Sequence, residues 1–276
     1  MSDQPDRYAV IGNPVAHSRS PEIHAAFAAQ TGQSLVYARL PAEIDAFEAT
    51  VARFFADGGL GLNVTLPFKQ QASEYADTLT DRARHAGAVN TLARQGDGRI
   101  LGDNTDGAGL LHDLNDRLLV DIRDARILIL GAGGAVRGVI PVLLDRQPAA
   151  LRVLNRTPDK ATQLATHFAD LGPVSGGGLD EASGGWDIVI NAISAGLAGE
   201  MPPLADTLVA DAIAAYDMIY ADAPTPFMRW ARAAGVTRCS DGLGMLVEQA
   251  AESFAVWRGI RPATEPVIRA LRPATQ

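Results

Sequence analysis

The chain has 276 residues, 47% of them hydrophobic and 20% charged, which is typical of a folded globular protein with room for two domains of ordinary size. Its formal charge of −8 and pI of about 5.1 argue against nucleic acid and membrane partners, because the overall field repels phosphate groups. One cysteine, Cys239, permits no intrachain disulfide, and without a signal peptide or a membrane span we expect a cytoplasmic protein.

The first hundred residues predict an α/β lobe. Tyr8–Ile11 is typical of a short strand that stops at Gly12, and a helix is expected to follow from Pro21. Apolar residues at helical spacing from Ile44 to Phe55 mark a second helix, which the glycine pair at 58 and 59 ends. Further extended pieces are expected at Leu60–Leu66, Ala88–Ala93 and Arg99–Gly102, and a turn-rich stretch is expected at Asp103–Gly109.

The middle of the chain follows a different rhythm. Arg126–Leu130 is a continuous apolar run, as in strands buried on both faces of a parallel sheet, and it stops at Gly131. Helical stretches separate three more strand candidates, Leu151–Leu154, Trp186–Ala192 and Ala215–Ile219, before a final helix from Met245 to Trp257 and a proline-punctuated tail. We therefore predict an α/β fold of two lobes, a discontinuous substrate domain (1–105 plus 242–276) and a Rossmann-type doubly wound domain with a parallel sheet (106–241).

A glycine-rich turn lies between a predicted strand and a predicted helix. Such a turn lets the backbone approach a pyrophosphate, which the N–H groups at the helix start then receive. Its candidate cofactor contacts are Gly131, Ala132, Gly133, Gly134 and Ala135. Val136 replaces the usual Gly or Ala at the third position of the pattern, and a tight strand-to-helix connection without a ligand is the alternative interpretation.

The end of the next strand favours NADP over NAD. NAD-binding domains place a carboxylate there for the ribose 2′-hydroxyl, whereas this chain has Asn155, Arg156 and Thr157. Arg156 can pair with a 2′-phosphate and stack on adenine, and Lys160 adds a second positive charge one helical turn later. Thr157 before Pro158 is also an ordinary helix cap, and without the glycine turn Arg156 would be an ordinary surface arginine.

Four polar sets stand among apolar surroundings. Each has a structural explanation, as loop serine, exposed lysine, strand-end amide or helix cap. They are Ser18 with Ser20, Thr65 with Lys69, Asn90, and Asp106.

Together these segments resemble the shikimate dehydrogenase family, in order along nearly the whole chain. The matching motifs are GNPVAHSRSP, NVTLPFK, GAVNTL, GDNTDG, GAGGA, NRT, DMIY and DGLGMLVEQA. The resemblance implies reversible reduction of 3-dehydroshikimate to shikimate with NADPH, a step toward chorismate and the aromatic amino acids.

By this resemblance, Ser18 and Ser20, assisted by Tyr220, would bind the substrate carboxylate through neutral hydroxyls. The ring hydroxyls would contact Asn90, Asp106, Thr65 and Gln249. Lys69 is the expected acid-base group, because a positioned ammonium can stabilise negative charge on the carbonyl oxygen and deliver a proton. Asp106 would orient the amine and favour its charged form.

The resemblance also adds cofactor contacts at Asn155, Met218 and Gly242, with Asp81 as a weaker one. Departures from the family pattern are Val136, Ile193 in the run NAIS, and Lys160 in place of Arg, and they bear on cofactor affinity. No metal is expected, because the five histidines show no ligand-like spacing.

We expect the active site in the cleft between the lobes, with hinge motion on ligand binding, and a monomer or homodimer without nucleic acid or membrane partners. Two alternatives stay open. One is an NAD-dependent dehydrogenase acting on quinate and shikimate, and the other is a degenerate, non-catalytic module that senses NADP or shikimate.

Overall fold

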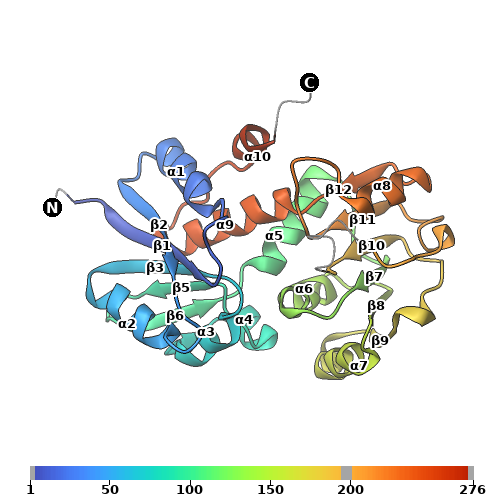
Figure 1. Cartoon of the computed structure of the whole chain (residues 1–276), viewed down its shortest axis with the longest axis horizontal. Helices are drawn as coiled ribbons and strands as arrows, with labels where there is room; N and C mark the ends of the chain where they lie inside the picture. Colours follow the sequence, from blue (N-terminus) through green and yellow to red (C-terminus); the bar gives the residue numbers. More distant parts are fainter. Residues whose placement is uncertain (1–3, 194–200, 273–276) are drawn as a thin grey trace. The chain divides into compact units, whose positions relative to one another are not determined.

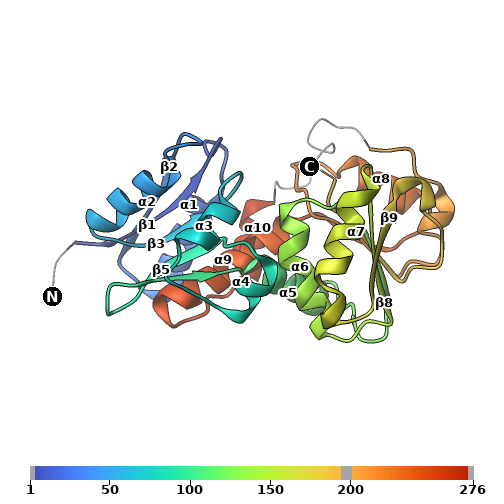
Figure 2. The same cartoon turned by 90° about the horizontal axis from the view of Figure 1, so that it is seen from below.

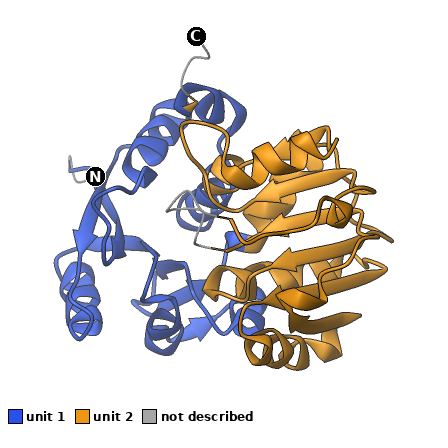
Figure 3. Cartoon of the chain, turned by 45° about the vertical axis from the view of Figure 1, so that its right-hand side comes forward, with its two compact units in different colours: residues 1–106, 247–271 blue, residues 107–246, 272–276 orange. Residues whose placement is uncertain are grey.

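The computed structural model describes residues 4–193 and 201–272. The chain forms two compact units, unit 1 with residues 1–106 and 247–271, and unit 2 with residues 107–246 and 272–276 (Figure 3). One division follows Asp106 directly, and another falls inside the long helix α9 (Leu243–Arg258). Within the described ranges, none of the helices has both the length and the apolar character that a membrane crossing requires.

Unit 1 is built on a six-stranded mixed sheet with the order β2-β1-β3-β5-β6-β4 (Figure 1). Strand β1 runs parallel to β2 and β3, whereas β5 runs antiparallel to β3 and to β6. The strands are β1 (Asp6–Gly12), β2 (Leu35–Pro41), β3 (Gly59–Val64), β4 (Thr78–Leu79), β5 (Thr91–Arg94) and β6 (Ile100–Asp103). The helices are α1 (Ser20–Thr31), α2 (Phe47–Ala56), α3 (Lys69–Tyr75), α4 (Asp81–Ala86) and α10 (Glu265–Leu271), together with most of α9.

The first two helices of unit 1 have identifiable start and stop signals. Proline occupies the first turn of α1, and Gly32 ends the helix in the left-handed conformation with φ +64°, donating to the carbonyl of Ala28. Helix α2 ends at Ala56, shortly before Gly58 with φ +88°. The apolar stripe of α2, which includes Phe47 and Val51, is fully buried in the core of unit 1.

Several predicted boundaries in unit 1 are wrong. Ile44 lies outside α2 and is 67% exposed. The predicted strand Leu60–Leu66 ends at Val64, and Leu66 is exposed. The stretch Asp103–Gly109 is not a series of turns, because Asp103 completes β6 and helix α5 (Asp106–His112) begins at Asp106, whose N–H donates to the side chain of Asn104.

Unit 2 is a doubly wound sheet of six parallel strands, which confirms the predicted fold class. Its order is β12-β11-β10-β7-β8-β9. Counted with β7 as the first strand and read from β9, this is the Rossmann order 3-2-1-4-5-6. The strands are β7 (Arg126–Leu130), β8 (Ala150–Asn155), β9 (Val174–Gly178), β10 (Ile188–Asn191), β11 (Ala214–Asp217) and β12 (Arg238–Ser240). The helices are α5, α6 (Gly134–Asp145), α7 (Pro158–His167) and α8 (Pro226–Ala233), with a π-helical turn after α5 at Asp113–Arg117 and short 3-10 turns at Ala169–Leu171, Leu179–Glu181 and Asp206–Leu208.

The central strand β7 is buried on both faces, as its unbroken apolar run predicts. Ile127 and Ile129 belong to the core that also holds residues of α6 and α7, two helices that lie beside one another in Figure 2. Leu128 and Leu130 belong to the core that also holds residues of α8. Val136 of α6 is fully buried in the first of these cores. The departure at the third glycine position is therefore accommodated as core packing.

Candidate active site

Lys69 and Asp106 form an ion pair within unit 1. The Nζ atom of Lys69 lies 2.5 Å from Oδ2 of Asp106, although 37 residues separate the two in sequence. Lys69 is the first residue of α3 and Asp106 is the first of α5. Their side chains are 17% and 9% exposed, respectively. The pair is thus shielded from bulk water but not sealed from it, which suits a group that exchanges a proton with a bound molecule.

Sheet topology explains why polar residues from distant segments gather there. Strands β1 and β3 end at the same edge of the sheet, where the antiparallel strand β5 begins and β6 ends, since Asn63 pairs with Thr91 and Thr91 pairs with Asp103. The segments that follow β1, β3 and β6, and the residue before β5, therefore share one edge. These positions hold Ser18 and Ser20, Thr65 and Lys69, Asp106, and Asn90.

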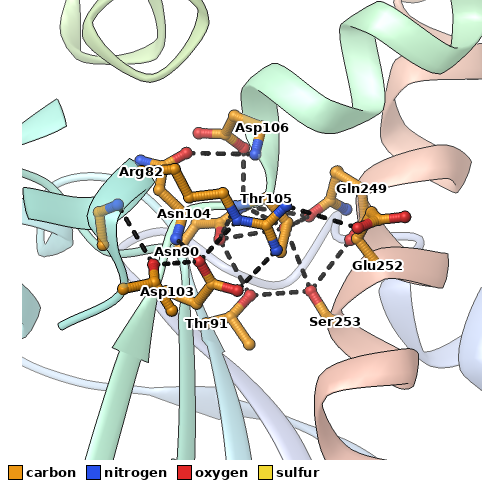
Figure 4. A network of polar contacts seen from close by, with 12 residues as sticks. Arg82, Asn90, Thr91, Asp103, Asn104, Thr105, Asp106, Gln249, Glu252 and Ser253 are labelled. Atoms are coloured by element: carbon orange, nitrogen blue, oxygen red, sulfur yellow. Dashed lines mark hydrogen bonds and ion pairs between the residues drawn. The ribbon is translucent and has the colours of Figure 1, made fainter. Parts of the chain in front are cut away.

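Asn90 lies at the centre of a buried hydrogen-bond network (Figure 4). Its Nδ2 atom donates to Oδ1 of Asp106 at 2.8 Å and lies 3.3 Å from Oε1 of Gln249. Its Oδ1 atom accepts from the backbone N–H of Thr105 at 2.9 Å. Asn90, Asp106 and Gln249 are thus brought together, as their predicted shared role requires.

Several members of this network were not predicted, among them Thr105 and Ser253. The Oγ1 atom of Thr105 lies 2.9 Å from Nδ2 of Asn90. Ser253 is fully buried on α9 and its Oγ atom accepts from Nδ2 of Asn63 at 2.8 Å. Helical spacing was the available signal for Ser253, which follows Gln249 by one turn.

A second buried ion pair anchors the strand that precedes Asp106. The guanidinium of Arg82 contacts both carboxylate oxygens of Asp103, at 2.7 and 2.6 Å. Burial raises the pKa of Asp103, but the hydrogen bonds and positive charge of Arg82 outweigh it, so the pKa is lowered overall. Asp103 therefore stays ionised and fixes the end of β6, immediately before Asp106.

The two serines predicted to hold a carboxylate are close neighbours in unit 1. The hydroxyl of Ser18 lies 3.1 Å from that of Ser20, at the start of α1. Thr65 follows β3, and its N–H donates to the carbonyl of Ile11. A side chain at Gly12 would meet the methyl group of Thr65 at 2.5 Å, so glycine there permits this close approach of the two segments.

Unit 2 contains a cavity of about 530 Å³ at the carboxyl ends of β7, β8 and β10. This is the switch point of the Rossmann order, where dinucleotides bind in such sheets. Predicted cofactor residues line one part of it, namely Gly131, Ala132, Gly133, Asn155, Arg156, Thr157 and Lys160. Apolar residues that were not predicted as contacts line the remainder, namely Leu179, Ala192, Ile193, Met201, Pro202 and Pro203.

The glycine turn fits a pyrophosphate. Gly131 has φ +109°, and a Cβ atom there would lie 2.9 Å from the backbone of Ala192, so only glycine fits. Side chains at Gly133 or Gly134 would meet no atom of the described residues within 4 Å. The backbone of this turn is therefore open to a ligand at the start of α6, a 12-residue helix that begins at Gly134 and continues through Ala135.

The remaining predicted residues lie outside that cavity. Met218 and Gly242 are in unit 2, where the N–H of Gly242 donates to the carbonyl of Ile219 and a Cβ atom on Gly242 would meet the carbonyl oxygen of Met218 at 2.3 Å. Tyr220 follows in the same segment of unit 2, whereas Ser18 and Ser20 belong to unit 1. Asp81 is in unit 1, where its carboxylate pairs with Arg84.

Two further predictions concern the run NAIS and metal binding. In the run NAIS, Ile193 lines the cavity, whereas Ser194 lies outside the described residues. Across the two described ranges, no three His, Cys, Asp or Glu side chains gather in a way that would hold a metal ion.

Three domain families match the chain. They are described as the shikimate dehydrogenase substrate binding domain (residues 10–92), shikimate/quinate 5-dehydrogenase (residues 113–199) and the shikimate 5′-dehydrogenase C-terminal domain (residues 242–272). These matches run through both units.

Similar proteins span almost the full length. Shikimate dehydrogenase (NADP(+)) from Thioalkalivibrio sulfidiphilus is 58% identical, covering 97% of this chain and 98% of the relative. The enzyme of that name from Alkalilimnicola ehrlichii is 55% identical, with 97% and 99% coverage. A crystal structure of shikimate 5-dehydrogenase from Thermus thermophilus in complex with NADP(H) and shikimate superimposes with a TM-score of 0.86 at 33% identity, covering 96% of this chain and 98% of that one.

Proposed function

The chain belongs to the shikimate dehydrogenase family, and from this we propose that it reduces 3-dehydroshikimate reversibly to shikimate with NADPH, using Lys69 and Asp106 as its acid-base pair. The single observation that carries the residue assignment is the 2.5 Å contact between Lys69 and Asp106, within a network that also holds Asn90 and Gln249. Unit 1 would bind the substrate and unit 2 the NADP.

The reduction adds a hydride to the carbonyl carbon of the substrate and a proton to its oxygen. NADPH, when bound, would supply the hydride and become NADP+. The ammonium of Lys69 stabilises the negative charge that develops on the oxygen and delivers the proton to it. In the oxidation of shikimate, the neutral amine accepts that proton instead.

Asp106 would fix the Lys69 ammonium and accept a hydrogen bond from a substrate hydroxyl. Its two oxygens are held by different partners, Oδ2 by Lys69 and Oδ1 by Asn90. A carboxylate held in this way loses little freedom when the substrate arrives, so the catalytic geometry is set before binding.

Substrate recognition is assigned to neutral polar groups at the same sheet edge. The hydroxyls of Ser18 and Ser20, 3.1 Å apart, suit the two oxygens of a carboxylate, with Tyr220 proposed to assist. The remaining contacts, with ring hydroxyls, are assigned to Thr65, Asn90 and Gln249.

NADP fits the cavity of unit 2 through three features. The glycine turn would receive the pyrophosphate, and Arg156 with Lys160 would face the 2′-phosphate, because none of the described residues that line the cavity is a carboxylate that would favour a 2′-hydroxyl. Asn155 is held in place by its hydrogen bond to the carbonyl of Thr157 at 3.0 Å. Met218 and Gly242 are proposed to lie near the nicotinamide, and Asp81 to make a weaker cofactor contact.

Both ligands are water-soluble metabolites, so we place the reaction in the cytoplasm. The chain would act on small molecules, as a monomer or homodimer, without a nucleic acid or membrane partner.

One assay separates this function from the alternatives. Nicotinamide absorbance is followed with purified protein, using shikimate and quinate, each with NADP and with NAD. Shikimate with NADP is expected to give by far the highest kcat/KM. Comparable rates with quinate and NAD would instead support a dual-substrate dehydrogenase, and binding of NADP without turnover would support a sensing module.

A further inference from the structure

Strand β2 was not predicted from the sequence. It presents two polar side chains toward the sheet edge that carries the proposed substrate residues. Tyr37 and Arg39 are two positions apart, so they lie on the same face of the strand. The hydroxyl of Tyr37 donates to Oδ1 of Asn63 at 2.7 Å. The guanidinium of Arg39 donates through Nε and Nη2 to the carbonyl oxygen of Ser18, at 3.0 and 2.6 Å.

The loop that Arg39 holds is the one that carries the serine pair. Within that loop, the N–H of Ser18 donates to the carbonyl of Val15, and the Ser18 hydroxyl lies 3.3 Å from the N–H of Ser20. The two hydrogen bonds from Arg39 hold the peptide group that follows Ser18 against strand β2. The carbonyl that Arg39 holds belongs to Ser18. Because the Ser18 hydroxyl is on the same residue, fixing the carbonyl limits the directions in which that hydroxyl can point.

Resting on the proposed function, we propose that Arg39 is a positioning residue for the substrate carboxylate, because its guanidinium fixes the Ser18 peptide and so the direction of the Ser18 hydroxyl. A planar guanidinium with two N–H groups on one acceptor restrains direction as well as distance. Its positive charge is partly balanced by Glu22, which lies 3.8 Å from Arg39 and also pairs with Arg19. Orientation, more than charge, is therefore the role assigned to Arg39.

The test is Arg39→Met, which keeps an unbranched side chain of similar volume to the aliphatic part of arginine and removes its donors. The KM for shikimate is expected to rise about tenfold while kcat stays within about twofold, because a partly exposed, charge-assisted hydrogen bond is lost. Arg39→Lys should show at least half of that increase in KM, because an ammonium lacks the coplanar N–H donors of a guanidinium. The dissociation constant of NADPH, from fluorescence titration, should be unchanged in both variants.

Arg7→Met is the matched control. Arg7 is also an exposed arginine on a strand of unit 1, and its Nη1 atom donates to a backbone carbonyl, that of Asp57, at 2.7 Å. This variant should leave the KM for shikimate at the wild-type value.

A second substrate shows whether the effect acts through the carboxylate. For shikimate, kcat/KM should fall about tenfold in Arg39→Met, whereas for the carboxamide of shikimate it should fall less than about threefold. Equal losses on both substrates, an unchanged KM in Arg39→Met, or a wild-type KM in Arg39→Lys would each overturn the proposal. If Arg39→Met does not fold, as judged by lost NADPH binding, the KM of Arg39→Lys for shikimate tests the proposal instead. A wild-type protein that does not oxidise shikimate would refute the function itself, which is a different result.

Discussion

The side-chain amide of Asn90 donates to Oδ1 of Asp106 at 2.8 Å, while the other oxygen of that carboxylate contacts Lys69. Asn90 is almost fully buried, and its own oxygen accepts from Thr105 and Thr91. Asn90 therefore links the acid-base pair to the interior of unit 1 and holds Asp106 in one orientation.

Replacement of Asn90 by Ala is expected to lower both activity and stability. Loss of the amide leaves the buried N–H of Thr105 without this partner, which costs about 1–3 kcal/mol of unfolding free energy. It also frees Asp106 to rotate, so kcat for shikimate oxidation should fall about tenfold or more. Urea denaturation and steady-state kinetics measure the two effects. A stable variant with wild-type kcat would show that Asp106 needs no such support.

Arg156→Ala tests the cofactor preference. Arg156 is exposed at the cavity of unit 2, and its proposed partner is a group that NADP has and NAD lacks. Loss of a charge-assisted phosphate contact should raise the KM for NADP about tenfold or more and that for NAD by less than about twofold. Arg123→Ala is the control, because Arg123 is also exposed in unit 2 and bonds Gln147 outside the cavity. Equal increases for the two cofactors would refute the 2′-phosphate assignment.

His24 predicts a pH dependence of stability. Its ring is 1% exposed and stacks on Tyr37 with centroids 4.2 Å apart. No described residue makes a hydrogen bond of good geometry with either ring nitrogen. Burial lowers the pKa of His24 from 6.5 to about 3, although the nearby Asn63 amide partly opposes this. Between these two values the unfolded chain binds the extra proton, so the free energy of unfolding falls as the pH falls.

The measurement compares wild type with His24→Phe by urea denaturation at two pH values. From about pH 7 to about pH 5, wild type should lose about 2 kcal/mol more unfolding free energy than the variant. His85→Phe, at an exposed position, should keep the wild-type dependence. An identical pH dependence in wild type and His24→Phe would show that His24 is not the group responsible.

The fold was predictable where one physical signal dominates. The apolar run of β7 indicated a strand buried on both faces, and the glycine turn after it indicated the switch point of a Rossmann sheet. Strand β2 escaped prediction because it lies at a sheet edge, where its side chains alternate between partly buried and exposed and include Arg39. The stretch from Asp103 misleads sequence analysis because polar residues that cap a helix have the same composition as a turn.

The residues of the candidate site were predictable from the sequence, but the side chains that hold them in place were not. Motifs indicated Lys69, Asn90 and Asp106, which the structure brings into contact. The supporting groups, such as Ser253 and Arg39, depend on contacts between segments far apart in sequence, namely α9 with β3 and β2 with the Ser18 loop. Helical spacing places Ser253 one turn from Gln249, but no local pattern reports the contacts themselves.

Lys69→Ala tests the central claim most directly, through the kcat of shikimate oxidation with NADP at saturating concentrations of both. The account predicts that kcat falls about 100-fold or more, because proton transfer loses its group. The dissociation constants of shikimate and NADPH should change little. Undiminished kcat in a variant that binds both ligands would contradict the assignment of Lys69 as the acid-base residue.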